Sequence, residues 1–173
     1  MIFKINEAIE VLERTPVVLE QMLGGLSSDW IMNNEGPETW CPYDVVGHLI
    51  HGEKTDWIAR LDIILSDGNK NFTPYDRFAQ FKESKGKSLP QLLDEFKELR
   101  KQNVSTLKSK GLTDADFDKT GNHPSFGEVT LKQLLATWVA HDLSHINQIT
   151  RVMSKQYKIE VGPWKAYLPV MNK

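Results

Sequence analysis

The sequence predicts an all-α protein, a four-helix bundle in which a long crossover joins the second and third helices. Apolar residues recur at steps of three and four in separate segments, no segment alternates convincingly with a period of two, and helix start and stop signals bound the segments. The connection over residues 69–87 is long for antiparallel neighbours in a bundle. We therefore expect the second and third helices to be parallel, which gives an up-down-down-up order.

The first predicted helix contains apolar residues at helical spacing from Ile5 onward. Thr15 followed by Pro16 has the form of an N-cap with proline at the first helical position, so a kink or a new helix start is expected there. The pair Gly24 and Gly25 marks the end of this helix.

The second and third predicted helices have clear start signals. Pro42 stands at a first helical position and Asp44 lies in the first turn, while Gly68 marks the end of the second helix. Ser88 and Gln91 have the spacing of a capping box, which places the start of the third helix at residue 88.

The fourth predicted helix begins at a second capping box, formed by Thr130 and Gln133. One turn of helix is expected before it, at "TDADFD", followed by an irregular loop over residues 119–129. After it, the tail over residues 161–173 is too rich in Pro and Gly for a helix and is expected to pack over one end of the bundle. The core-facing positions of this helix are predicted to be Leu131, Leu134, Trp138, His141, His145, Gln148 and Val152.

Composition excludes several classes of protein. The 173 residues suit a single domain spanning 1–173, and a net charge of −2 provides no basic surface for nucleic acid. The single cysteine, Cys41, excludes an intramolecular disulfide, and no apolar run approaches the roughly 18 residues of a membrane span. The charged, amphipathic N-terminus is unlike a signal peptide. We expect a cytoplasmic protein with no nucleic-acid or membrane partner.

Two histidines occupy core-facing positions four residues apart, His141 and His145. A buried neutral imidazole must satisfy a donor and an acceptor, and each unmade bond costs about 1–3 kcal/mol. Two histidines at this spacing on a helix can bind one metal ion, which would satisfy both. The alternative is a pair of core histidines bonded to neighbouring side chains and water.

The second predicted helix supplies two more histidines, His48 and His51. Either of them, if it faces the pair on the fourth helix, would complete a face of three nitrogen ligands. Three protein ligands leave coordination positions open for water or substrate, which is the catalytic pattern. Imidazole ligands suit zinc, nickel, iron or copper.

The stretches "TWCPYDVVGHLIHGE" and "HDLSHINQI" resemble the DinB-like superfamily. The "TP" break in the first helix, the lead "G-x-x-T-L" into the fourth and the "VGPW" tail are also similar, so the resemblance covers nearly the whole chain. A serine or threonine is more usual as the cap at Cys41, and this cysteine has no evident partner that would make it a nucleophile. The residues that carry the resemblance are Trp40, His48, Leu49, Glu53, His141, Asp142, His145 and Gln148.

The resemblance implies a four-helix bundle, often a homodimer, that holds a divalent metal ion on three histidines, and we expect zinc or nickel as this ion. By position these are His48, His141 and His145. Members of the family include metal-dependent thiol transferases and a thiol-dependent isomerase, and many others are named hydrolases without a demonstrated substrate. The implied partner is a small-molecule substrate that can be a thiol.

Several polar residues stand near these positions. Asp44 lies one turn before His48, where it would either orient that imidazole or only interact with the helix N-terminus. Glu53 falls on an apolar stripe and needs a partner, either close to the metal ligands or in a structural network. Asp142 points away from the core-facing positions of its helix and is expected to bond a neighbouring helix. Gln148 would stand beside the histidine ligands and tune their surroundings.

The other histidines and the tryptophans have less specific assignments. His51 is expected to be a partly exposed surface residue, and His123 either an ordinary turn residue or an acid or base at the bundle mouth. Trp40, Trp138 and Trp164 could wall a pocket, although core packing is the expectation for Trp138.

The function expected from these features is that of an enzyme whose metal ion activates water or a thiol. One alternative is a thiol S-transferase that acts in detoxification. The other is a non-catalytic dimeric bundle with a structural or vestigial metal, which would lose much stability on chelation and turn over no substrate.

Overall fold

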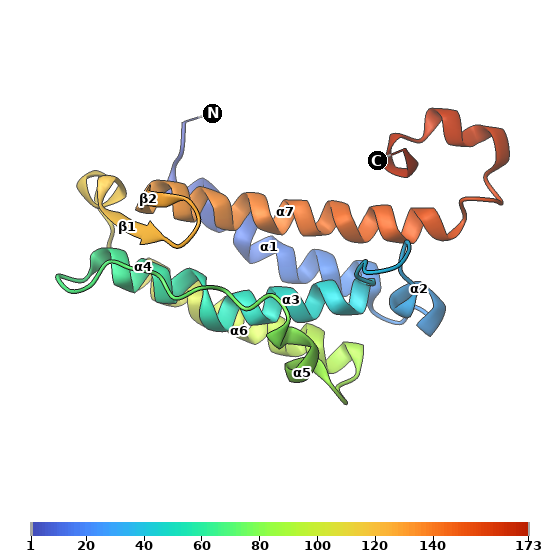
Figure 1. Ribbon diagram of the computed structural model, residues 1–173, viewed down its shortest axis with the longest axis horizontal. Helices are drawn as coiled ribbons and strands as arrows, with labels where there is room; N and C mark the ends of the chain where they lie inside the picture. The colour runs from blue at the N-terminus through green and yellow to red at the C-terminus, as the bar shows by residue number, and fades with distance from the viewer. Residues whose placement is uncertain (1, 173) are drawn as a thin grey trace.

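The computed structural model describes residues 2–172 and contains a four-helix bundle. The helices of the bundle are α1 (Ile5–Leu23), α3 (Pro42–Thr55) continued by α4 (Trp57–Leu65), α6 (Leu89–Ser109) and α7 (Leu131–Gln156). In Figure 1, α1 and α7 run in one direction, whereas α3–α4 and α6 run in the other. The predicted up-down-down-up order is therefore confirmed.

Short elements connect and flank the bundle. None of the helices in residues 2–172 is long and apolar enough to cross a lipid bilayer. The short elements are α2 (Ser28–Met32), α5 (Ala79–Ser84), β1 (Thr120–His123), β2 (Gly127–Thr130) and the 3₁₀ helices η1 (Asp114–Asp118), η2 (Gly162–Tyr167) and η3 (Pro169–Met171).

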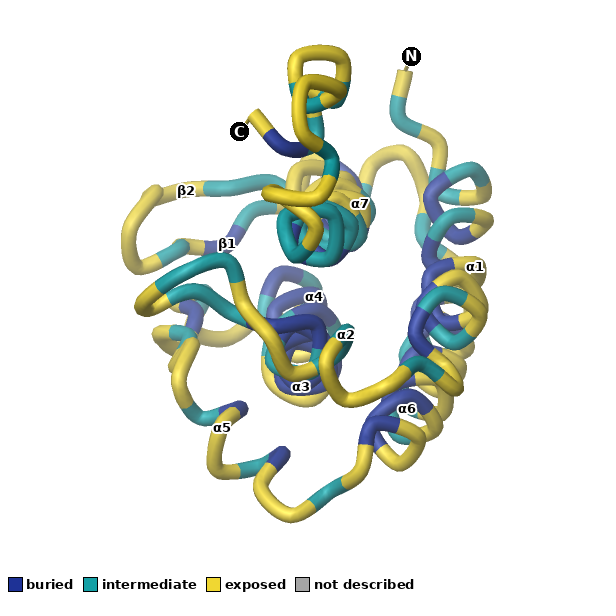
Figure 2. Tube along the Cα trace, turned by 90° about the vertical axis from the view of Figure 1, so that its right-hand side faces the viewer, coloured by how far each residue is buried: buried dark blue, intermediate teal, exposed yellow. Residues whose placement is uncertain are grey.

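The core lies between the four long helices, whose buried faces point toward one another (Figure 2). It consists of two apolar clusters, one at each end of the bundle. The first is built around Leu12, Leu61 and Trp138, and the second around Leu49 and Phe96. Polar residues stand between these clusters, where α3 and α7 face each other, and they form the site described below.

The capping signals in the sequence are confirmed. Ser88 Oγ accepts from the Gln91 backbone N–H at 3.4 Å, and Thr130 Oγ1 accepts from the Gln133 backbone N–H at 3.2 Å. In each box the glutamine Oε1 accepts a hydrogen bond from the backbone N–H of the capping residue. These caps fix where α6 and α7 begin and therefore which residues of each helix face the core.

The predicted helix start at Thr15 is wrong, because α1 continues through Pro16. Thr15 Oγ1 donates to the Val11 carbonyl at 3.2 Å instead of capping a new helix. Proline has no N–H to donate to the carbonyl four residues earlier, that of Leu12. Arg100 Nη1, from α6, donates to the Leu12 oxygen at 2.9 Å. A buried side chain thus replaces the missing backbone bond.

The second predicted helix is broken at Asp56, where φ is −111° and the chain passes from α3 to α4. The Asp56 N–H still donates to the Gly52 carbonyl at 3.0 Å, and the Arg60 N–H donates to the Asp56 carbonyl at 2.9 Å. These backbone hydrogen bonds continue across Asp56, so the break does not separate α3 from α4. Asp56 also lines the wall of a cavity.

The crossover contains a short helix, α5, that the sequence analysis assigned to a loop. This helix packs closely on α3 at Gly47, where an added Cβ would lie 2.4 Å from Ser84 Oγ. The Tyr43 hydroxyl, also from α3, lies within hydrogen-bonding distance of the Ser84 carbonyl at 2.7 Å. A helix of six residues is too short to show a periodic pattern in the sequence.

The loop before α7 forms an antiparallel hairpin, β1–β2, in which Thr120 pairs with Thr130. The expectation that the chain has no strands is therefore wrong for residues 120–130. The crossover joins the hairpin, because the Phe72 N–H donates to the Asn122 carbonyl at 2.9 Å. Strands of four residues are too short to produce a visible alternation.

The tail forms two short 3₁₀ helices beside the end of α7 (Figure 1). Met171 is buried against the bundle, in agreement with the expected packing. Trp164 and Tyr167 remain 69% and 80% exposed, so the tail covers less of the bundle than its apolar composition suggested.

Candidate metal centre

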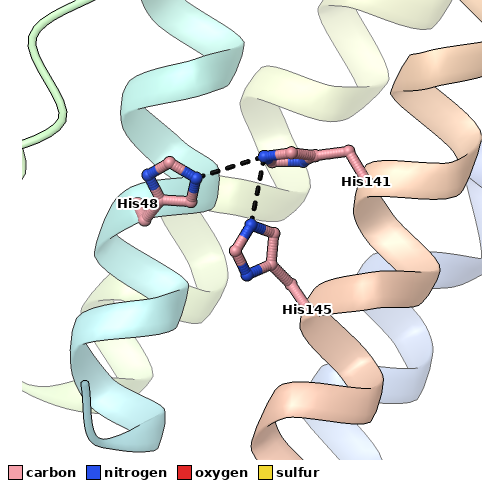
Figure 3. Close-up of side chains that lie close together, drawn as sticks. All are labelled: His48, His141 and His145. Atoms are coloured by element: carbon pink, nitrogen blue, oxygen red, sulfur yellow. Dashed lines mark hydrogen bonds between the residues drawn. The ribbon is translucent and has the colours of Figure 1, made fainter. Parts of the chain in front are cut away.

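Three histidines converge between α3 and α7, as Figure 3 shows. His141 Nε2 lies 3.1 Å from His48 Nε2 and 3.1 Å from His145 Nε2. All three nitrogens lie within 4.8 Å of one another. The structure therefore brings together the three residues that the family resemblance implies as metal ligands.

Two of the rings have a partner on the opposite nitrogen. His145 Nδ1 lies 2.8 Å from Gln148 Oε1, one turn further along α7, and His48 Nδ1 lies 3.1 Å from the Tyr75 hydroxyl. When these oxygens accept from Nδ1–H, each Nε2 presents a lone pair toward the centre of the cluster. His141 Nδ1 is buried and has no hydrogen-bond partner among residues 2–172.

The three imidazoles are neutral near pH 7. Burial, reinforced by the charge of neighbouring groups, lowers the pKa of His48 to about 3 and that of His141 to about 2. Burial also lowers the pKa of His145. Neutral imidazole is the form that binds a metal ion, so these residues have their lone pairs free for coordination at physiological pH.

The cluster fits a cation better than it fits an ordinary hydrogen-bonded core. When Gln148 and Tyr75 both accept from Nδ1–H, the inner nitrogens of His145 and His48 are both acceptors. His141 has one Nε2–H at most and can donate to only one of them, which leaves the lone pair of the other ring without a donor, 3.1 Å from the His141 nitrogen. A cation at the centre would attract all three lone pairs.

The other predicted residues around the ligands divide into two groups. Gln148 contacts a histidine of the cluster, as expected. Asp44 does not contact His48: its Oδ2 accepts from the backbone N–H and the Sγ of Cys41, both at 3.1 Å, so it caps the N-terminus of α3. The contact to His48 comes instead from Tyr75, which the sequence analysis missed because it lies in the aperiodic crossover.

Glu53 belongs to a buried network and does not contact the histidine cluster. Its Oε1 accepts from Arg100 Nη2 at 2.8 Å and from Trp138 Nε1 at 3.1 Å. Asp142 accepts from the same guanidinium at 2.5 and 2.9 Å, which matches the expectation that this side chain bonds a neighbouring helix. Asn103 completes the network by donating to Glu53 Oε2 at 3.0 Å.

His51 is buried, so the expectation that it is a partly exposed surface residue is wrong. Its Nδ1 lies 2.9 Å from Glu83 Oε1 on α5, the helix that the sequence did not reveal. Trp138 packs in the core as expected. Cys41 is a poor candidate nucleophile, because burial and the hydrogen bond to Asp44 raise the pKa of its thiol to about 12.

A cavity of about 360 Å³ adjoins the histidine cluster. His123, from strand β1, lies in the wall of this cavity. This position agrees with the expectation of a histidine at the bundle mouth, and its role as an acid or base stays a prediction. Arg60 pairs with Asp56 at 2.5 Å on another part of the wall. Besides the three clustered histidines, the lining residues include Trp40, Asp56, Trp57, Arg60, Tyr75, Arg77 and His123.

Comparisons with known proteins agree with this architecture. A protein of Oceanobacillus iheyensis is 24% identical over 154 residues, covering 88% of this chain and 87% of the relative. A protein of Bacillus mycoides is 27% identical over 158 residues, covering 87% and 86%. Both carry the name "Putative metal-dependent hydrolase".

A solved structure, YfiT from Bacillus subtilis, is similar with a TM-score of 0.76 and 26% identity over 91% of each chain. It is described as a probable metal-dependent hydrolase with an unusual four-helix bundle topology. The family model of the DinB superfamily matches residues 11–149, which include most of the bundle and all three clustered histidines. This chain belongs to the DinB superfamily.

Proposed function

We propose that this protein is a metal-dependent enzyme in which His48, His141 and His145 hold a divalent cation, zinc or nickel, beside a cavity for a small-molecule substrate. The observation that carries the proposal is the convergence of three neutral, largely buried imidazoles next to an open cavity. A divalent cation on three protein ligands keeps coordination positions open and lowers the pKa of a water or thiol placed there.

The chain's own residues provide the supporting functions. Gln148 and Tyr75 orient two of the imidazoles through their outer nitrogens. Trp57 and Trp40 pack against the cluster, with ring centroids 5.1 Å from His141 and 4.9 Å from His48, and exclude water from its sides. All three histidines line the cavity, and the two tryptophans line it beside them.

The non-catalytic alternative is less consistent with this arrangement. Structural zinc sites are closed, with four protein ligands, whereas three histidines lie together here and a cavity adjoins them. The names of the relatives support hydrolysis as the reaction class. Thiol transfer uses the same kind of site and differs only in the nucleophile.

Activity assays of metal-loaded and chelator-treated protein test the proposal. Both forms are assayed on a panel of esters, amides and phosphoesters, and for conjugation of a low-molecular-weight thiol to a test electrophile. The proposal predicts turnover that requires the metal, is lost in His48→Ala, and is accompanied by only a modest loss of stability on chelation. A large loss of stability on chelation, with no turnover in any assay, would support the non-catalytic bundle with a structural or vestigial metal.

A further inference from the structure

A second and larger cavity adjoins the one beside the histidines. Its volume is about 710 Å³, within the usual range of small-molecule sites. Trp40 and Arg77 line both cavities, so the two share a boundary. The larger cavity lies where the segment before α3 meets the crossover around α5, and a molecule that fills it can extend to the histidine cluster.

Aromatic rings form part of the wall of the larger cavity. Phe81 and Phe78, from the crossover, are 44% and 64% exposed although both are large apolar residues. Phe81 packs edge-on against Trp40 with ring centroids 6.2 Å apart, and Phe78 stacks on Phe81 at 6.4 Å. Exposed rings gathered on a concave surface provide an apolar face for a ligand with a flat apolar part.

Most charged groups around the two cavities already have partners in the protein. Glu35 binds Arg151 at 2.5 Å and Lys155 at 2.8 Å, a group with one positive charge in excess. Asp56 binds Arg60 at 2.5 Å, and these two charges cancel. The Asp44 carboxylate accepts two bonds from Cys41 at the start of α3.

Arg77 is different, because its guanidinium has no hydrogen-bond or ion-pair partner among residues 2–172. It is exposed, stands on the shared boundary, and lines the same cavity as His48. Glu38, on the wall of the larger cavity, is the acidic residue there that likewise has no such partner in the described chain.

We propose that the joined cavities bind an organic anion with a flat apolar body, whose anionic group pairs with Arg77 and whose body lies against Trp40 and Phe81. A guanidinium binds carboxylate or phosphate oxygens through parallel N–H bonds, which makes arginine suited to such groups. The inference rests on the proposed function, since it names the class of substrate that the metal centre would receive. Trp40 also packs against His48, with ring centroids 4.9 Å apart, so a molecule held on Trp40 lies next to the histidine cluster.

The test uses naphthalene-2-carboxylate and its uncharged analogue naphthalene-2-carboxamide. Each is titrated into chelator-treated protein, with affinity from calorimetry and location from the indole N–H signal of Trp40, assigned through Trp40→Phe. The carboxylate is expected to bind at least about tenfold more tightly than the carboxamide and to shift the Trp40 signal, because a charge-assisted hydrogen bond distinguishes the two probes.

Three variants show whether Arg77 is the cause. Arg77→Gln should remove the preference for the carboxylate while affinity for the carboxamide stays unchanged. Arg14→Gln, which removes an exposed charge on α1 away from the cavities, should behave like the wild type. Glu38→Gln, which removes the opposite charge from the same cavity, should leave carboxylate binding equal or tighter.

Equal affinity for the two probes, a preference that survives Arg77→Gln, or a Trp40 signal that does not move would each overturn the inference. Because the titrations use metal-free protein, failure here does not depend on the metal centre. Failure of the proposed function would instead appear as absence of metal-dependent turnover.

Discussion

Arg100 Nη1 donates a hydrogen bond to the backbone carbonyl of Leu12 at 2.9 Å, and this bond links the turn of α1 that contains Pro16 to the polar centre of the bundle. Pro16 leaves the Leu12 carbonyl without its helical donor. The same guanidinium binds Glu53 on α3 and Asp142 on α7, the residue next to His141. One side chain of α6 therefore ties together all three of the other long helices beside the histidine cluster.

Replacing Arg100 with methionine should destabilise the protein by about 3–5 kcal/mol, because two buried carboxylates lose the cation that pairs with both of them. Urea unfolding of chelator-treated protein measures the loss. Arg14→Met, at an exposed position, is the matched control and should change the stability by about 0.5 kcal/mol or less. A loss below about 1 kcal/mol for Arg100→Met would contradict the assigned role.

The Leu12 bond can be tested separately through Pro16. Pro16→Ala restores an N–H four residues after Leu12, which can donate to the carbonyl that Arg100 now serves. We expect Pro16→Ala to be more stabilising by about 1 kcal/mol in the Arg100→Met background than in the wild type. The double-mutant cycle by urea unfolding measures this coupling, and strictly additive effects would show that the two sites are independent.

The stability of the metal-free protein should fall as the pH decreases from about 6.5 toward about 3. Burial lowers the pKa of His141 to about 2 and that of His48 to about 3, whereas in the unfolded chain these groups take up protons near pH 6.5. Over this window the unfolded state binds more protons, so each histidine removes up to about 1.4 kcal/mol per pH unit.

Urea unfolding at several pH values, with a chelator present, measures this dependence. The double variant His48→Gln/His141→Gln retains the carboxylates, which titrate in the same range, and removes only the two imidazoles. Its stability should vary less steeply with pH than that of the wild type. Equal slopes for the two proteins would mean that these histidines do not stay neutral in the folded state.

Tyr75→Phe should weaken metal binding by about 10–100-fold, because it removes the hydroxyl that contacts His48 Nδ1. Competition against a chromophoric chelator measures the affinity. Tyr167→Phe, on the exposed tail, removes a hydroxyl elsewhere and should bind the metal as the wild type does. An unchanged affinity in Tyr75→Phe would remove this tyrosine from the site.

Gly47→Ala should loosen the contact between α3 and α5, because the new Cβ would lie 2.4 Å from Ser84 Oγ. The expected cost is about 1–3 kcal/mol, the usual range for overpacking. Hydrogen exchange should show faster exchange in α5, and adding Ser84→Ala, which removes the clashing oxygen, should restore part of the protection. No change in exchange for Gly47→Ala would show that this contact is not tight in solution.

The long helices and the histidine cluster could be predicted because their information is periodic. The spacing along α7 places His141 and His145 on one face, and capping boxes at Ser88 and Thr130 fix two of the helix starts. The choice of His48 over His51 came from the family resemblance. Both side chains are buried, and helical spacing alone did not decide which one faces α7.

The surroundings of the site could not be predicted, because they come from aperiodic segments and from long-range pairing. Tyr75 lies in the crossover, and its contact with His48 depends on how that segment folds over the bundle. No sequence pattern marks Arg100 as a buried residue, since its two carboxylate partners come from other helices. The partner of His51 is on α5, which is too short to leave a pattern.

The most direct test of the metal centre is elemental analysis of tag-free protein beside His48→Ala, His145→Ala and His123→Ala. About one equivalent of zinc or nickel is expected in the wild type and in His123→Ala, whose histidine lies in the cavity wall outside the cluster. The other two variants should have lost the metal. Absence of metal from the wild type after reconstitution near neutral pH, or its retention in both cluster variants, would contradict the three-histidine site.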